Sequence, residues 1–332
     1  MAEAKKRLFT GIQSSGTLHI GNYFGALRPF LDTYQDYESF LMIADYHALT
    51  SLKNPGELRK NIFDVVRDYL AVGVDPNKAV IFQQSRVCEH TELAWILDCL
   101  VPVAMLELGH AYKDKVAKGL EANAGLLTYP VLMAADIILY DTDIVPVGQD
   151  QKQHIEYARE AAKKFNLAYG KTFKEPQEKI QTGVAVVPGT DGKKMSKSYG
   201  NTIPLFGSKD EITKAVMSIV TDSGPQTEVE NLRETGIQSG NFLQPLNLGR
   251  IHTLLKSKEE LFDLYANNQN NYKAIKEALI EDLEAFIAPM RAKRESITDE
   301  EVRRVIEEGS AKAKAIASAK MAEVRQKVGV SL

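Results

Sequence analysis

Three short apolar runs, with a helical pattern between two of them, constrain the fold of the first two hundred residues most strongly. The runs at residues 8–12, 40–44 and 79–82 each have the length of a buried strand. Between the last two, apolar residues recur at helical spacing, with Pro55 near the start of that helix and Gly73 just past its end. Strand, crossover helix and strand in this order predict a parallel sheet covered by helices. Such sheets bind ligands at the carboxyl ends of their strands.

Beyond Pro204 the pattern changes from strands to helices. Segments rich in Ala, Glu, Lys and Leu predict helices at residues 210–220, 258–267, 272–286 and 300–328. Two stretches rich in Gly, Pro, Gln and Asn, residues 223–240 and 241–250, are predicted as loops. The sequence therefore predicts an α/β domain over residues 1–204 and an all-helical domain over residues 205–332, whose last helix is able to pack back on the first domain.

Composition excludes several other classes of protein. No run approaches the eighteen apolar residues of a membrane span, and no apolar stretch follows the basic N-terminus as in a secretory signal. We therefore expect a cytoplasmic protein without a membrane partner. Cys88 and Cys99 are too few for a zinc cage or a disulfide framework and are predicted to be buried free thiols.

The segment from Gln13 to Tyr23 follows the first predicted strand and is expected to open a helix near its end. Its glycines let the backbone approach a nucleotide closely, and a helix N-terminus favours negative charge. His19 and Asn22 flank Gly21, so both can face phosphate groups. A histidine beside glycines is, taken alone, more often a turn or core residue.

A second polar segment, Lys-Met-Ser-Lys-Ser at residues 194–198, lies in a predicted loop entered through Gly189 and Gly192. The two lysines, Lys194 and Lys197, suit a pyrophosphate leaving group, whose charge grows as the bond to the α-phosphate breaks. A lysine-rich loop is usually only a solvated surface, so this segment is also inconclusive alone.

Together and in this order, the two segments resemble the paired motifs of class I aminoacyl-tRNA synthetases. Residues 19–22 match the family's His-Ile-Gly-His with Asn22 in the last place, and residues 194–198 match Lys-Met-Ser-Lys-Ser in full. The resemblance implies a Rossmann-like catalytic domain in which an amino-acid carboxylate attacks the α-phosphate of ATP and the aminoacyl group then passes to tRNA. Mg²⁺ would accompany ATP, held by phosphates and waters without a dedicated protein metal site. The implied catalytic residues are His19, Asn22, Lys194, Ser196 and Lys197.

A third stretch carries information about the substrate. Tyr129, Met133 and Asp136 are spaced by four and three residues, on one face of a predicted helix. They could belong to a core helix with one exposed acid, or to a pocket for an aromatic side chain with one hydrogen-bond donor. Indole fits the second reading, because its N–H only donates. A phenol would also suit a carboxylate, so tryptophan and tyrosine are not separated by this argument.

From Phe9 to about Val328 the chain is similar to bacterial tryptophanyl-tRNA synthetases, which have methionine and aspartate at the places of Met133 and Asp136. The resemblance implies L-tryptophan and tRNA(Trp) as substrates, a tRNA-binding helical domain and a homodimer. The implied tryptophan-binding residues are Phe9, His47, Tyr129, Met133, Asp136, Val145, Val147 and Gln151. The implied ATP-binding residues are Gln13, Ser14, Ser15, Gly21, Asn22, Lys115, Gly148, Gln149, Asp150, Val186, Lys194, Met195, Ser196, Lys197 and Ser198.

Other conspicuous residues are expected to have ordinary roles. His154 is predicted to be structural, His90 and His252 to lie on the surface or in loops, and Trp95 to pack in the interior. Basic residues near the C-terminus, Lys312, Lys314 and Arg325 among them, are candidates for phosphate contacts with tRNA. Three alternatives stay open: a tyrosyl-tRNA synthetase of the same subclass, a nucleotidyltransferase of the same superfamily, and a catalytically silent relative that only binds RNA.

Overall fold

The computed structural model describes residues 5–13, 16–119, 121–147, 152–180, 187–221, 243, 246–269 and 271–331. The chain forms two compact units, which we describe separately. Unit 1 comprises Met1–Gly16, Phe30–Thr182 and Ile297–Leu332, and unit 2 comprises Thr17–Pro29 and Gly183–Ser296. The two units are groups of residues that pack compactly together, and they do not test the functional boundary near residue 204. That boundary stays a prediction.

Unit 1 is built on a five-stranded parallel sheet in the order β3-β2-β1-β4-β5. The three predicted strands are confirmed, and with them the predicted parallel α/β fold. Two further strands lack a clear strand signal in the sequence, because one contains Pro146 and the other contains the charged residues Glu178 and Lys179. The strands are β1 (Arg7–Gln13), β2 (Glu38–Ala44), β3 (Ala79–Gln83), β4 (Ile144–Val147) and β5 (Gln177–Ile180).

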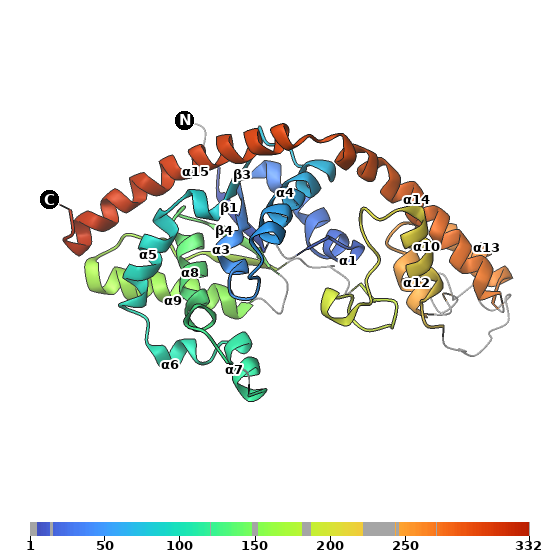
Figure 1. Ribbon diagram of the computed structural model, residues 1–332, viewed down its shortest axis with the longest axis horizontal. Helices are drawn as coiled ribbons and strands as arrows, with labels where there is room; N and C mark the ends of the chain where they lie inside the picture. Colours follow the sequence, from blue (N-terminus) through green and yellow to red (C-terminus); the bar gives the residue numbers. More distant parts are fainter. Residues whose placement is uncertain are drawn as a thin grey trace. The chain divides into compact units, whose positions relative to one another are not determined.

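Helices surround this sheet in unit 1 (Figure 1). The helix predicted between Pro55 and Gly73 is confirmed as α4, whose N-cap Asn54 accepts hydrogen bonds from two backbone N–H groups. The helices are α3 (Asp45–Ala48), α4 (Pro55–Ala71), α5 (Glu89–Asp98), α6 (Val103–Leu106), α7 (His110–Ala117), α8 (Ala124–Ile138), α9 (Lys152–Tyr169) and α15 (Asp299–Val328), with short 3₁₀ turns η2 (Tyr34–Asp36) and η3 (Gln84–Arg86).

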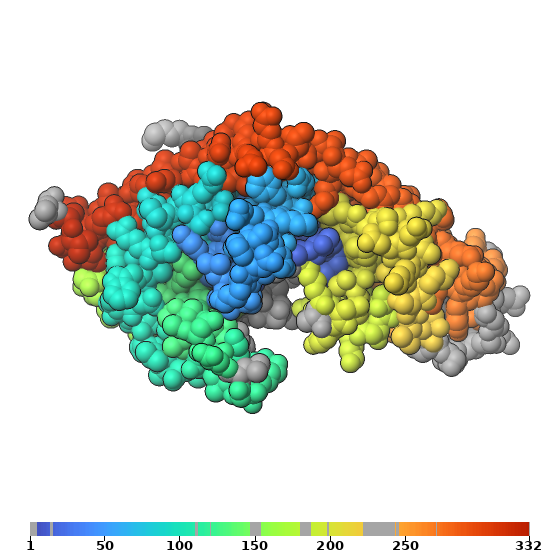
Figure 2. Space-filling model, in the orientation of Figure 1, coloured from blue at the N-terminus to red at the C-terminus, as the bar shows by residue number. Residues whose placement is uncertain are grey.

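Helix α15 covers the open edge of β3, where backbone groups would otherwise lack partners in the sheet. Gly309 lies directly on Ile81, and the Ser310 hydroxyl accepts a hydrogen bond from the Gln83 N–H at 3.3 Å. In the space-filling view the same helix, in red, lies on the segments that form α4 and α5 (Figure 2). The 30 residues of α15 thus belong to the same compact unit as β1, the first strand of the chain.

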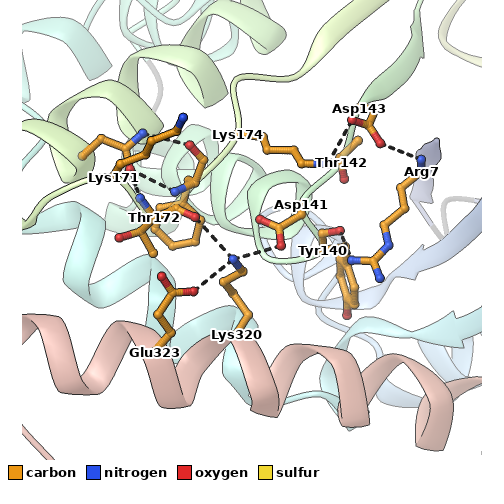
Figure 3. Close-up of polar contacts among 12 residues, drawn as sticks. Arg7, Tyr140, Asp141, Thr142, Asp143, Lys171, Thr172, Lys174, Lys320 and Glu323 are labelled. Carbon is orange, nitrogen blue, oxygen red and sulfur yellow. Dashed lines mark hydrogen bonds and ion pairs between the residues drawn. The ribbon is translucent and has the colours of Figure 1, made fainter. Parts of the chain in front are cut away.

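A polar network fixes α15 at a second place in unit 1 (Figure 3). The Lys320 ammonium contacts Asp141 at 2.9 Å and Glu323 at 3.3 Å, and it donates to the Thr172 carbonyl oxygen. The helix is therefore tied both to the edge of β3 and to the loops before β4 and β5.

Unit 2 has helices as its regular structure in the described residues, apart from isolated bridges. Ser208 and Ser257 begin two of these helices with capping boxes. The helices predicted after Pro204 are confirmed. The unit contains α1 (Ile20–Asn22), the π-helix η1 (Tyr23–Leu27), the turn η5 (Lys197–Tyr199), α10 (Lys209–Met217), α12 (Leu246–His252), α13 (Lys258–Asn267) and α14 (Tyr272–Ser296); α2 (Arg28–Leu31) spans the junction with unit 1.

One loop prediction is wrong. Helix α12 (Leu246–His252) begins inside the stretch 241–250 that we predict as a loop, because Leu248 and Ile251 are buried and Gly249 packs closely on Leu243. Tertiary packing here outweighs weak helix propensity. The other predicted loop, residues 223–240, lies outside the described residues.

Several burial predictions on helix α5 and its ends are also wrong. Cys88 and Cys99 are exposed, and Trp95 is 71% exposed. The buried residues of α5 are instead Glu89, His90, Leu93, Ala94 and Leu97, so Trp95 falls on the outward face of the helix. None of the helices within the described ranges is long and apolar enough to cross a membrane.

Candidate active site

The turn at residues 19–22 is held by a reciprocal pair of hydrogen bonds in unit 2. The His19 Nδ1 accepts from the Asn22 N–H at 3.3 Å, and the Asn22 side-chain oxygen accepts from the His19 N–H at 3.1 Å. A π-helical segment follows immediately, a rare form that often marks functional sites. The predicted helix start is confirmed close to Tyr23, and the two predicted catalytic side chains define its geometry.

His19 is held as a neutral imidazole at physiological pH. Its side chain is almost buried, and burial together with the positive charge of Lys197 lowers the pKa of His19 to about 4. Because Nδ1 is the acceptor for Asn22, the ring proton lies on Nε2. The histidine can therefore act as a hydrogen-bond donor through Nε2 without carrying a charge.

The two sequence motifs meet in unit 2. A Cβ placed on Gly21 would lie 2.9 Å from the His19 Nδ1 and 3.2 Å from the Met195 Cβ. Any side chain at position 21 would therefore displace His19 or Met195, so glycine suits the close approach of the two motifs. Backbone hydrogen bonds of Leu205 with Leu18 and of Ile20 with Ile203 hold the same two chain segments together.

The lysine segment is shaped by Asn201. Its side chain accepts a hydrogen bond from the Ser196 N–H at 2.8 Å and donates to Asp191 at 2.6 Å and to the Lys194 carbonyl oxygen at 3.1 Å. Met195 is buried, whereas the side chains of Lys194 and Lys197 are exposed. Asn201 thus holds the backbone of the loop, and the loop presents two positive charges. No short sequence motif indicates this role of Asn201.

In unit 1, Asp136 is a fully buried carboxylate with three donor partners. The His90 Nδ1 lies 2.6 Å from one oxygen and the His47 Nε2 lies 2.7 Å from the other, while the Gln84 amide donates to both at 2.9 and 3.0 Å. Burial alone would raise the pKa of Asp136, but His90 and His47 lower it to about 2. Asp136 is therefore an ionised acceptor, and the reading of this position as an exposed acid is wrong.

His90 and Tyr140 extend this cluster into the core. The His90 Nε2 lies 2.8 Å from the Tyr140 hydroxyl, and the Tyr140 ring stacks on Phe9 and Phe40. The prediction that His90 is a surface residue is wrong, and so is that for His252, which is buried against Tyr265 and Asp282. The helical spacing of His90 with Leu93 and Leu97 is the sequence signal that could have placed it inside.

Four of the other predicted tryptophan-binding residues, Phe9, Tyr129, Met133 and Val145, lie in the described part of unit 1. Tyr129 and Met133 are half-buried on α8 with Asp136, as their spacing predicts, and Tyr129 makes edge contacts with the His47 and His154 rings. Phe9 and Val145 are buried side chains of the adjacent strands β1 and β4.

The structure describes only some of the other predicted ATP-binding residues. Gln13 ends β1 and donates to the His47 carbonyl oxygen at 3.3 Å, and Lys115 is a half-buried residue of α7. The hollow that contains Gln13 is lined by Gln13, Gly16, Ala48, Ser51, Leu52, Glu57 and Asn61. Ser14, Ser15, Gly148, Gln149, Asp150, Gln151 and Val186 lie outside the described residues, as do the side chains of Val147 and Ser198.

Sequence comparison finds relatives along nearly the whole chain. The family model for class I tRNA synthetases (W and Y) matches residues 1–312. The tryptophan–tRNA ligase of Fusobacterium nucleatum is 48% identical over 331 residues, with 98% of each chain covered. That of Rhodopirellula baltica is 44% identical over 329 residues, which cover 98% of this chain and 99% of the relative.

Comparison with solved structures also finds tryptophanyl-tRNA synthetases. The tryptophanyl-tRNA synthetase of Campylobacter jejuni, complexed with ADP and tryptophan, is 41% identical with a TM-score of 0.87, and the match covers 97% of this chain and 99% of that one. The tryptophanyl-tRNA synthetase of Mycoplasma pneumoniae is 33% identical with a TM-score of 0.81, over 98% of each chain. A tyrosyl-tRNA synthetase from Archaeoglobus fulgidus, 19% identical with a TM-score of 0.62, shares the fold.

Proposed function

The chain belongs to the class I tRNA synthetases for tryptophan and tyrosine, and we propose that it is a tryptophan–tRNA ligase. It activates L-tryptophan with ATP, giving tryptophanyl-adenylate and pyrophosphate, and then transfers tryptophan to tRNA(Trp). The observation that carries the activation step is the packing of Gly21 on Met195, which brings the two motifs of the class into contact. The choice of tryptophan is supported by relatives of this name at up to 48% identity.

The residues of unit 2 would act on ATP. The His19 Nε2–H would donate to a phosphate oxygen that gains charge as the carboxylate attacks, with Asn22 fixing the orientation of the ring. Lys194 and Lys197 would stabilise the departing pyrophosphate, and Ser196 would help to hold it. Donors fixed before the reaction stabilise developing charge without reorganisation, and the loss of one typically lowers the rate by about 10²–10³-fold.

The residues of unit 1 would hold tryptophan. Asp136 would accept the indole N–H, while Phe9, Met133 and Val145 would contact the ring and Tyr129 the amino-acid groups. His47 lies against Asp136 and would lie at the edge of this pocket. A phenol could also donate to Asp136, so the test below compares tryptophan with tyrosine directly.

Mg²⁺ would enter with ATP as part of the nucleotide substrate, bound by its phosphates and waters. Within the described residues there is no group of three histidine, cysteine or acidic side chains that could hold a metal ion. The metal would help to neutralise the triphosphate, and the protein's own contribution would come from the lysines of residues 194–198.

We also propose tRNA(Trp) and a second copy of the chain as partners. Lys312 and Lys314 are exposed on α15, whereas Arg325 is held by both oxygens of Glu92 at 2.7 and 2.6 Å, so the two lysines are the better candidates for phosphate contacts. An enzyme that charges tRNA for translation would work in the cytoplasm.

A homodimer is supported by large apolar side chains exposed on unit 1. Trp95, Val103, Leu108 and Val116 are more than half exposed on and around α5, α6 and α7. Apolar side chains of this kind mark a protein interaction site where they form one contiguous patch. Analytical ultracentrifugation of the protein and of Trp95→Glu checks this: we expect a dimer that the charged variant weakens, and a monomeric parent protein would contradict it.

The proposed reaction is tested by ATP–pyrophosphate exchange with all twenty amino acids in parallel. We expect exchange with tryptophan alone, and loss of about 10²-fold or more in Lys197→Ala. Exchange with tyrosine and not tryptophan would instead identify a tyrosyl enzyme. Unchanged exchange in Lys197→Ala would contradict the role of the lysine segment, and no exchange with any amino acid would indicate a silent relative.

A further inference from the structure

Asp136 is held by donors from three different elements of unit 1. His90 comes from α5, His47 from α3 and Gln84 from η3, and their contacts with the carboxylate are 2.6 to 3.0 Å long. His90 and Gln84 are fully buried, whereas the His47 side chain keeps some exposure. The carboxylate is thus fixed by two buried partners, and His47 is the one partner whose side chain keeps some exposure.

The hydrogen-bonding roles in the buried part of the cluster can be assigned. A contact of 2.6 Å between the His90 Nδ1 and an ionised carboxylate requires a proton on Nδ1. Burial and the nearby charge of Asp136 raise the pKa of Tyr140, so its hydroxyl keeps its proton. The Tyr140 hydroxyl lies 2.8 Å from Nε2, at the other side of the imidazole ring, so this contact holds His90 with Nδ1 directed at Asp136.

One of the contacts on Asp136 is open to replacement by a substrate donor. An ionised carboxylate offers about four lone-pair positions, and His90, His47 and Gln84 together make four contacts with it, of which only the one from His47 comes from a side chain that keeps some exposure. Because His90 and Gln84 fix both oxygens, the position that His47 occupies has a defined direction. A substrate with a single N–H donor, such as indole, suits a site of this kind.

We propose that His90 and Tyr140 are positioning residues for substrate selection: the buried chain from the Tyr140 hydroxyl through His90 orients Asp136 to accept the indole N–H. This inference rests on the proposed tryptophan ligase function. Neither residue needs to touch the substrate, since both act through Asp136. Specificity would depend on preorganisation of the acceptor rather than on the carboxylate alone.

A sulfur isostere of tryptophan separates positioning from a merely structural role. In 3-benzothienylalanine a sulfur replaces the indole N–H, so the ring shape is kept and the donor is lost. A site built to bond an N–H rejects an analogue without it, by as much as about 10⁴-fold. Damage to packing would lower kcat/KM for both amino acids, whereas loss of a fixed acceptor would lower the preference for tryptophan.

The variants follow from the contacts. Tyr140→Phe removes the hydroxyl and keeps the ring that stacks on Phe9 and Phe40. His90→Leu removes the donor to Asp136, and His90→Asn keeps an N–H close to the place of Nδ1. Each full-length variant is compared with the parent by ATP–pyrophosphate exchange, and thermal melting reports on folding.

We expect the preference for tryptophan over the isostere to fall about tenfold in Tyr140→Phe and about 10²-fold in His90→Leu, with partial rescue in His90→Asn. The KM for ATP should stay unchanged. An unchanged preference in Tyr140→Phe would overturn the inference, even if His90→Leu fails to fold. Absence of tryptophan-dependent exchange in the parent protein would instead overturn the proposed function, so the two failures are distinguishable.

Discussion

Replacing Gly309 by alanine sets helix propensity against the close contact of α15 with the sheet edge. In a helix interior, alanine is favoured over glycine by about 1 kcal/mol, so propensity alone predicts stabilisation. At this position the added methyl group would lie 2.7 Å from the Ile81 carbonyl carbon, and closer still to its oxygen. The contact therefore predicts that Gly309→Ala destabilises the protein.

The magnitude follows from the geometry. Non-bonded carbon atoms stay about 3.5–4.0 Å apart, so α15 would have to move back by about 1 Å. That shift would lengthen the bond between Ser310 and the Gln83 N–H, which is already 3.3 Å long. Overpacking costs about 1–3 kcal/mol and a lost hydrogen bond about 1 kcal/mol, against a propensity gain of about 1 kcal/mol. We expect a net loss of about 1–3 kcal/mol.

Urea denaturation followed by circular dichroism measures this change. Ala311→Gly, at an exposed position of the same helix, is the matched control and should lose only about 1 kcal/mol through propensity. A Gly309→Ala protein as stable as the parent, or more stable, would refute the argument that close packing of α15 on β3 outweighs helix propensity.

The candidate site residues of each unit give further predictions. Gly21→Ala should slow ATP–pyrophosphate exchange by about 10²-fold by displacing His19 and Met195, with little loss of melting temperature; an unchanged rate would be inconsistent with the tight packing. Asp136→Asn should raise the KM for tryptophan about 10–100-fold and leave the KM for ATP unchanged, as steady-state kinetics can check. The pKa of His19 is about 4 in the folded protein, against 6.5 for an unperturbed histidine side chain. The unfolded chain therefore binds the proton first, and stability should fall as the pH drops from 6.5 toward 4, by up to about 3 kcal/mol. Denaturation at pH 7 and pH 5 should show a larger loss for the parent than for His19→Gln.

The parts of the site that sequence could predict are those formed by neighbours in the chain. His19 and Asn22 bond to each other across three residues, and Met133 and Asp136 share one helix face, so short motifs and helical spacing locate them. The first three strands and the crossover helix were predictable for the same reason, because their apolar periodicity is local.

The features that sequence missed depend on contacts between distant residues. The bond of His90 to Asp136 spans 46 positions and that of Gln84 spans 52, and no local pattern records either. The helix α12 forms where a weak propensity is overcome by burial of Leu248 and Ile251. The sequence also does not predict that each compact unit is built from separate segments of the chain. The change of composition near Pro204 suggests only one domain boundary.

The position of α15 on β3 has a consequence for biosynthesis. The ribosome makes β3 at residues 79–83 and reaches α15, which begins at Asp299, more than two hundred residues later. At about 5–20 residues per second, the edge of β3 stays uncovered for roughly 10–40 s in each nascent chain. Unpaired strand edges are templates for aggregation during that interval. The yield of folded protein in a cell should therefore depend on the speed of translation and on chaperones that occupy this edge until α15 emerges.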